Sequence, residues 1–174
     1  MSFLRKYENQ VNAFVKTCRA LAAAKYVTSQ GGNLAWKLEE DLILITPTQQ
    51  SKEDIRPEDV VFIDRAGETR EGTRAPTGEK PMYLEFFRIR RDIESVIHCH
   101  PPAACAAAIM KGTNWLERPL FPETVFEVGP VPIVPYAEPL TRRLAENLAG
   151  FLPAYNTFLI ENRGVVSTRR RDIR

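Results

Sequence analysis

The sequence predicts a single-domain α/β protein, and three observations support this fold class. Its 174 residues suit one domain with a core of its own. Apolar residues near the start recur at three- and four-residue steps, as on one face of a helix. Short apolar runs bounded by turn-forming residues follow, as expected for strands. Because no repeat or linker divides the chain, we expect one domain over residues 1–174.

The apolar pattern predicts four helices. The first is one long amphipathic helix that starts at Phe3 and ends near Lys25-Tyr26. Three more helices are predicted from prolines that lie in, or just before, a first helical turn. These helices cover residues 81–89, 103–111 and 139–149. Leu140 is expected on the apolar side of the last helix.

Extended segments are predicted between these helices. They cover residues 33–38, 42–46, 60–64 and 94–100, with a closing pair at 157–160 and 165–167. The connection from Pro119 to Pro135 contains five prolines. We therefore expect no regular element there.

Composition excludes several classes of protein. The 24 basic and 22 acidic residues leave a net charge of only +2. The one dense basic run, residues 169–171, resembles a solvated tail. No nucleic-acid partner is therefore expected. Three cysteines without a CxxC pair argue against a disulfide framework and indicate a reducing compartment. Residues 1–6 are polar and charged and no apolar run is long enough to cross a membrane, so we expect neither a signal segment nor a membrane span. We expect a cytoplasmic protein with no membrane partner.

The strongest chemical signal is the segment Val96-Ile97-His98-Cys99-His100-Pro101. Side chains alternate along a strand, so His98 and His100 should lie on one face. Two imidazoles side by side can chelate a divalent metal ion. The alternative is a pair of half-buried histidines that bind backbone groups, because this spacing alone is only moderately specific.

Glu79 and three small-residue loops are further candidates. A carboxylate just before the helix at 81–89 could approach the histidines as a metal ligand or as an acid/base, although the local sequence alone favours an ordinary acid at the start of a helix. Glycines and hydroxyls suited to binding an anion occur in the loops 29–33, 46–51 and 77–78. Each loop alone is also consistent with a turn, and Gly31-Gly32 with a cap on the first helix.

The order of these segments resembles the class II aldolase/adducin family, from Phe3 to Arg174. After a first helix, the chain reads S-x-G-G-N, I-T-P-T, R-P-E-D-V-V-x-I-D, P-T-G-E, R-x-D-I-x-S-V-I-H-C-H-P-P and I-x-N-R-G-V-V. The resemblance, closest to fuculose-phosphate aldolases, implies a three-layer α/β/α fold with a mixed, mainly antiparallel central sheet. It also implies a homotetramer with active sites between subunits.

The resemblance further implies a metal-dependent lyase that cleaves a small sugar phosphate through a metal-stabilised enediolate. His98, His100 and Glu79 would bind the metal ion, most often Zn2+, and Glu79 would also be the acid/base. The substrate phosphate would be surrounded by Gly32, Asn33, Thr48, Thr77 and Gly78. Other members of the family are epimerases, dehydratases and decarboxylases.

The sequence departs from the family pattern at several positions. Arg163 stands where active members supply a third metal-binding histidine, and the chain has no other histidine to replace it. Gln49 stands where a glycine is usual, and Thr77-Gly78 replaces a pair of serines. The C-terminal helices usual in the family are expected to be missing. Three hypotheses remain: a lyase, a catalytically silent adducin-like binding or assembly module, and a weaker metal site in which Arg163 holds an anionic substrate.

These hypotheses lead to four expectations. His98 and His100 should project from one face with Glu79 close to them. Arg163 should turn toward Glu79 or a bound anion, and the protein should purify with little metal. The apolar connection from Trp115 to Pro135 should contact other subunits of a homo-oligomer.

Overall fold

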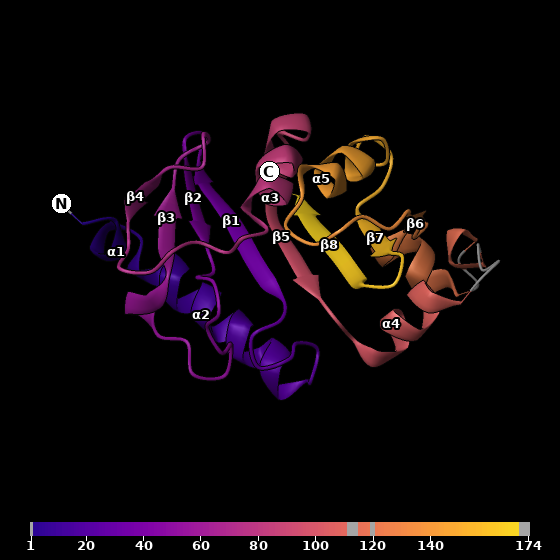
Figure 1. Ribbon diagram of the computed structural model, residues 1–174, viewed down its shortest axis with the longest axis horizontal. Coiled ribbons are helices and arrows are strands. Elements are labelled where there is room, and N and C mark those ends of the chain that lie inside the picture. Colours follow the sequence, from indigo (N-terminus) through magenta and orange to yellow (C-terminus); the bar gives the residue numbers. More distant parts are fainter. Residues whose placement is uncertain (1, 111–114, 119–120, 171–174) are drawn as a thin grey trace.

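The computed structural model describes residues 2–110, 115–118 and 121–170, which form one central sheet with helices on both faces (Figure 1). Its strands are β1 Asn33–Glu39, β2 Leu42–Ile45, β3 Val61–Ile63, β4 Thr69–Glu71, β5 Ile93–Cys99, β6 Ile133–Val134, β7 Thr157–Ile160 and β8 Gly164–Arg170. Their order across the sheet is β4-β3-β2-β1-β5-β8-β7-β6. All neighbours are antiparallel except β6 and β7, which are parallel. The predicted mixed, mainly antiparallel sheet is confirmed.

Helices cover the two faces of this sheet separately. They are α1 Phe3–Lys6, α2 Glu8–Ala23, α3 Lys80–Ile89, α4 Pro102–Ile109 and α5 Arg142–Ala149. On one face, α2 packs over β1 to β3 and α4 packs over β7 and β8. On the other face, α3 and α5 lie together over the middle of the sheet (Figure 1). The expected three-layer α/β/α architecture is therefore confirmed.

The first helix differs from the sequence prediction. Instead of one helix from Phe3 to near Lys25, the chain forms α1 and α2 with a break at Tyr7, whose backbone is not helical (φ −114°, ψ 29°). Tyr7 is buried, and its hydroxyl donates a hydrogen bond to Glu39. The helical apolar period continues through the break, so the pattern alone could not reveal it.

The connection from Pro119 to Pro135 also differs from its prediction. It contains a π-helical turn at Thr124–Val128 and the short strand β6, and a 3-10 turn at Trp115–Glu117 precedes it. The π turn lies within the seven proline-free residues between Pro122 and Pro130. Another missed element is β4, because its residues Thr69–Glu71 are polar and give no apolar signal. Pro119 lies outside the described residues.

Leu140 does not belong to the last helix, as the sequence had suggested. Thr141 precedes the first helical turn of α5, and Leu140 adopts a left-handed backbone conformation (φ 65°) with 61% of its surface exposed. Leu144 and Leu148 of α5 are buried, as predicted. Among the described residues, no helix is both long and apolar enough to cross a membrane.

Candidate active site

His98 lies near the end of β5, between two strands that begin beside it. It pairs with Asn33 of β1 and with Val166 of β8. Its Nδ1 is 3.0 Å from the carbonyl oxygen of Val165, which can only accept, so Nδ1 carries the proton and Nε2 is free to accept or to bind a metal ion. Burial lowers the pKa of His98 to about 4. The ring is therefore neutral at neutral pH.

His100 follows the strand and lies beside His98. The two ring centroids are 4.7 Å apart with an angle of 79° between the planes, so the predicted shared face is confirmed. Gly164 allows β8 to pack closely against His100, because a Cβ on this residue would lie 2.8 Å from Cδ2 of His100 and 2.6 Å from the carbonyl oxygen of Cys99. Burial lowers the pKa of His100 to about 4 as well. Its Nδ1 has no hydrogen-bond partner among the described residues.

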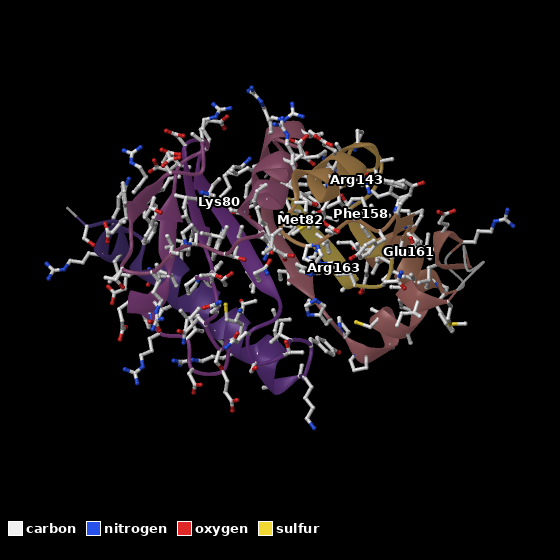
Figure 2. The ribbon with its side chains drawn as sticks, in the orientation of Figure 1. Lys80, Met82, Arg143, Phe158, Glu161 and Arg163 are labelled. Carbon is white, nitrogen blue, oxygen red and sulfur yellow. The ribbon has the colours of Figure 1, made fainter. Side chains whose placement is uncertain are left out.

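Glu79 joins the histidine pair from the start of α3. Its side chain is 5% exposed, and its Oε2 is 3.7 Å from Nε2 of His98. Arg163, on the turn between β7 and β8, makes an ion pair with Oε1 of Glu79 through Nη2 and is itself only 11% exposed. Figure 2 shows Arg163 in the middle of the molecule, at the start of β8. The expectations that Glu79 lies near the histidines and that Arg163 turns toward Glu79 are confirmed.

The residues predicted to surround a phosphate line one cavity of about 310 Å³ together with His98, His100, Glu79 and Arg163. They are Gly32, Asn33, Thr48, Thr77 and Gly78. Backbone hydrogen bonds tie the loops together: N–H of Thr48 donates to Ala75 and N–H of Thr77 donates to Thr46, each at 3.0 Å. These two amides are therefore already used. The hydroxyl oxygen of Thr77 accepts a hydrogen bond from the N–H of Glu79 at 3.3 Å, so its O–H group remains to donate to a ligand.

The glycine loop does not cap the first helix, because α2 ends at Ala23. Gly32 has φ +73°, and a Cβ there would lie 3.1 Å from the carbonyl oxygen of His98. Gln49, where the family usually has glycine, also adopts a positive φ of 53°. The glutamine thus keeps the backbone conformation that glycine favours.

Lys52 lines the same cavity and was not singled out from the sequence. It is 2% exposed, and its Nζ donates to the carbonyl oxygens of Gln30 at 3.2 Å and Gln50 at 2.9 Å. Burial lowers its pKa. A lysine in a polar turn is normally solvated, so no sequence signal indicated its burial.

Tyr83 is a second residue that sequence reasoning missed. Its hydroxyl, on α3, contacts both the carbonyl oxygen of Asn33, at 2.7 Å, and the side-chain oxygen of Asn33. Because that oxygen faces Tyr83, the amide NH2 of Asn33 is the part left for the cavity. Helical spacing could have placed Tyr83 in the core but not its contact with Asn33.

The donor set does not complete a catalytic zinc site. Such sites use three protein ligands and an open position. Here two neutral imidazoles are present, but the Glu79 carboxylate is paired with Arg163, whose permanent charge repels a cation. Among the described residues, no group of three or more His, Cys, Asp or Glu side chains is arranged to hold a metal ion.

The sequence matches the profile of one protein family, described as "Class II Aldolase and Adducin N-terminal domain", over residues 12–171. The chain is 31% identical over 145 residues to the 3-oxo-tetronate 4-phosphate decarboxylase of Pectobacterium atrosepticum, covering 82% of this chain and 66% of that protein. It is 30% identical over 166 residues to the 5-deoxy-D-ribulose 1-phosphate aldolase of Bacillus thuringiensis, covering 94% and 75%. It is 32% identical over 153 residues to the L-fuculose phosphate aldolase of Methanocaldococcus jannaschii, covering 88% and 80%.

Solved structures agree with these sequence matches. The crystal structure of YgbL from Klebsiella pneumoniae superimposes with a TM-score of 0.87 at 29% identity, covering 93% of this chain and 79% of that chain. An L-fuculose 1-phosphate aldolase superimposes with a TM-score of 0.80 at 28% identity, covering 92% and 75%. The chain therefore spans about two thirds to four fifths of the length of these relatives.

Proposed function

Because this chain belongs to the class II aldolase and adducin family, we propose that it is a lyase that breaks a carbon–carbon bond in a small phosphorylated sugar or sugar acid. One observation carries the proposal: the buried Glu79 carboxylate lies next to His98 in a cavity lined by three loops rich in glycine and hydroxyl groups. Cleavage of a phosphorylated sugar needs a group that transfers a proton and, beside it, polar loops that can bind the phosphate.

The relatives' substrates share one chemical feature. Cleavage of L-fuculose 1-phosphate or 5-deoxy-D-ribulose 1-phosphate between carbons 3 and 4, and loss of carbon dioxide from 3-oxo-tetronate 4-phosphate, leave the same three-carbon fragment. In each case the electron pair of the broken bond stays beside the carbonyl and forms an enediolate. Protonation of that carbon gives dihydroxyacetone phosphate. We propose that this chain stabilises the same enediolate.

The cavity residues have separate roles in this proposal. Asn33, Thr48 and Thr77 donate hydrogen bonds to the phosphate, and Gly32 and Gly78 leave room for it. In an aldol cleavage Glu79 accepts the proton of the hydroxyl on carbon 4 as the bond breaks and then delivers a proton to carbon 3 of the enediolate; after loss of carbon dioxide only this delivery is needed, with the proton drawn from water. Positive charge from Arg163 lies next to Glu79 and opposes the negative charge that builds up on the enediolate oxygen.

A divalent metal ion, most often Zn2+, is what the family resemblance implies. His98 and His100 would be its ligands, with Glu79 as the third. Since Arg163 occupies the carboxylate, we expect weak metal binding and assign no step of the reaction to the ion.

The proposal is tested by turnover of a panel of three phosphorylated substrates: L-fuculose 1-phosphate, 5-deoxy-D-ribulose 1-phosphate and 3-oxo-tetronate 4-phosphate. The unmodified protein should consume at least one, both after dialysis against EDTA and with added Zn2+ or Mn2+ as parallel conditions. Glu79→Gln should lower turnover about 10²–10⁴-fold, because an acid/base group typically contributes that much. A protein that binds these compounds but converts none of them would instead support the catalytically silent module.

A further inference from the structure

We propose that Arg163 and Lys52 make this cavity selective for a ligand with two anionic groups, a phosphate and a carboxylate, such as a four-carbon sugar acid phosphate. The inference rests on the proposed function, because it specifies the substrate class of the same cavity. It goes further by assigning the carboxylate to Arg163 and part of the phosphate charge to Lys52.

Lys52 is buried, Arg163 is largely buried, and both line the cavity. Lys52 is 2% exposed and the side chain of Arg163 is 11% exposed. Glu79 is the one acidic side chain among the described residues of the lining, against the two cationic side chains. The cavity thus carries a net positive charge, which a bound anion would neutralise.

Each cation has donor capacity left for a ligand. The ammonium of Lys52 has three N–H groups and uses two of them for the carbonyls of Gln30 and Gln50. Arg163 binds Glu79 through Nη2, whereas its buried Nη1 has no hydrogen-bond partner among the described residues. A buried donor without a partner is costly, so Nη1 indicates an acceptor supplied by the ligand.

The positions of the two cations suggest which group each one binds. Lys52 lies between the Gln30–Asn33 and Pro47–Gln50 segments, where Thr48 and Asn33 offer further donors to a phosphate. Arg163 lies against Glu79, the residue proposed to act at the reacting carbon. A planar guanidinium matches a carboxylate in a two-point contact, so a carboxylate bonded to the reacting carbon fits this position.

The test compares two ligands of equal length after removal of metal with EDTA. 4-Phosphoerythronate carries a phosphate and a carboxylate, whereas erythritol 4-phosphate has a hydroxymethyl group in place of the carboxylate. Isothermal titration calorimetry should show at least about 10-fold tighter binding of the acid, as expected for a charge-assisted pair. Equal affinities would overturn the inference while leaving a phosphate site intact. No binding of either compound would overturn both this inference and the proposed function.

Variants assign the two anionic groups to the two cations. Arg163→Gln should remove the preference for the acid while erythritol 4-phosphate binds as before. Lys52→Met should weaken both ligands by the same factor. Lys37→Met, which changes another buried lysine outside the cavity, should weaken neither. A preference that survives in Arg163→Gln would overturn the assignment.

A further variant should strengthen binding of the acid instead of weakening it. Unlike Arg163→Gln, it does not leave the buried Glu79 carboxylate without a cationic partner. Glu79→Gln frees Arg163 from its own carboxylate, so 4-phosphoerythronate should bind more tightly and erythritol 4-phosphate should be unchanged. If Arg163→Gln fails to fold, the double variant Glu79→Gln/Arg163→Gln removes both charges of the pair and should show no preference. Weaker binding of the acid to Glu79→Gln would contradict a ligand carboxylate at Arg163.

Discussion

Arg163 is the residue at which this chain departs most from a three-ligand metal site. The side chain enters the cavity from the position where the family resemblance implies a histidine, and it pairs with the one carboxylate that could complete the site. Two neutral imidazoles with a guanidinium beside them should bind a divalent ion weakly. Arg163 therefore gives the cavity a positive charge at the position where the family resemblance implies a neutral imidazole.

Replacement of Arg163 by histidine should restore a metal site. The variant removes the positive charge, frees Glu79 and adds a third imidazole beside His98 and His100. Loss of a residue that only hydrogen-bonds to a metal ligand already lowers metal affinity about 10–100-fold. Addition of a side chain that binds the metal itself should therefore raise the affinity by more than this. Elemental analysis after dialysis should find little metal in the unmodified protein and close to one ion per chain in Arg163→His. Full occupancy in the unmodified protein would refute this account of Arg163.

At the scale of elements, the site depends on how closely β8 approaches the end of β5. Gly164 starts β8 with its Cα against the carbonyl of Cys99 and the ring of His100. This contact brings Arg163, the preceding residue, into the lining of the cavity. The β7–β8 turn therefore sets the position of the cation relative to the histidines.

Gly164→Ala should disturb this junction. The added Cβ would lie 2.6 Å from a backbone oxygen that cannot move independently, so the free energy of unfolding should fall by about 1–3 kcal/mol, as for an overpacked core. Gly150→Ala is the matched control, because Gly150 has φ −67° and a Cβ there meets nothing within 4 Å. Urea denaturation should show a loss for the first variant and no loss for the second. Equal stability of both would show that β8 shifts without cost.

The sequence could predict the elements whose signal is local. The shared face of His98 and His100 follows from the two-residue period of a strand, and the collinear motifs placed Glu79 and the loop residues. The burial of Lys52 could not be predicted, because it depends on two backbone carbonyls from separate loops. The position of Leu140 also escaped prediction, since its apolar spacing fits α5 while its backbone is left-handed and its side chain packs near Gly78.

At the scale of the whole molecule, several large apolar side chains are exposed on the connection before β6. Phe121, Val125, Phe126 and Val128 are 68%, 50%, 88% and 38% exposed. An exposed apolar cluster of this kind is typical of a contact surface. On this ground we propose that this connection lies between subunits of a homo-oligomer, for which the family resemblance implies a tetramer.

Light scattering at micromolar concentration should therefore give a mass well above the 19.8 kDa of one chain. Phe126→Ser removes the most exposed of these side chains and should shift the mass toward that of the monomer without lowering the melting temperature of the subunit. A monomer in the unmodified protein would contradict the oligomer. An unchanged mass in the variant would exclude the π-helical turn at Thr124–Val128 from the interface.

The central claim is that the cavity around Glu79 generates the enediolate of a three-carbon ketose phosphate, whichever group leaves. The most direct measurement is hydrogen exchange of dihydroxyacetone phosphate in D2O, followed by proton NMR, because this exchange needs no knowledge of the leaving group. The unmodified protein should replace one hydrogen on the hydroxyl-bearing carbon by deuterium, and Glu79→Gln should slow this exchange about 10²–10⁴-fold. Exchange no faster than in buffer alone, with or without added Zn2+, would contradict the claim.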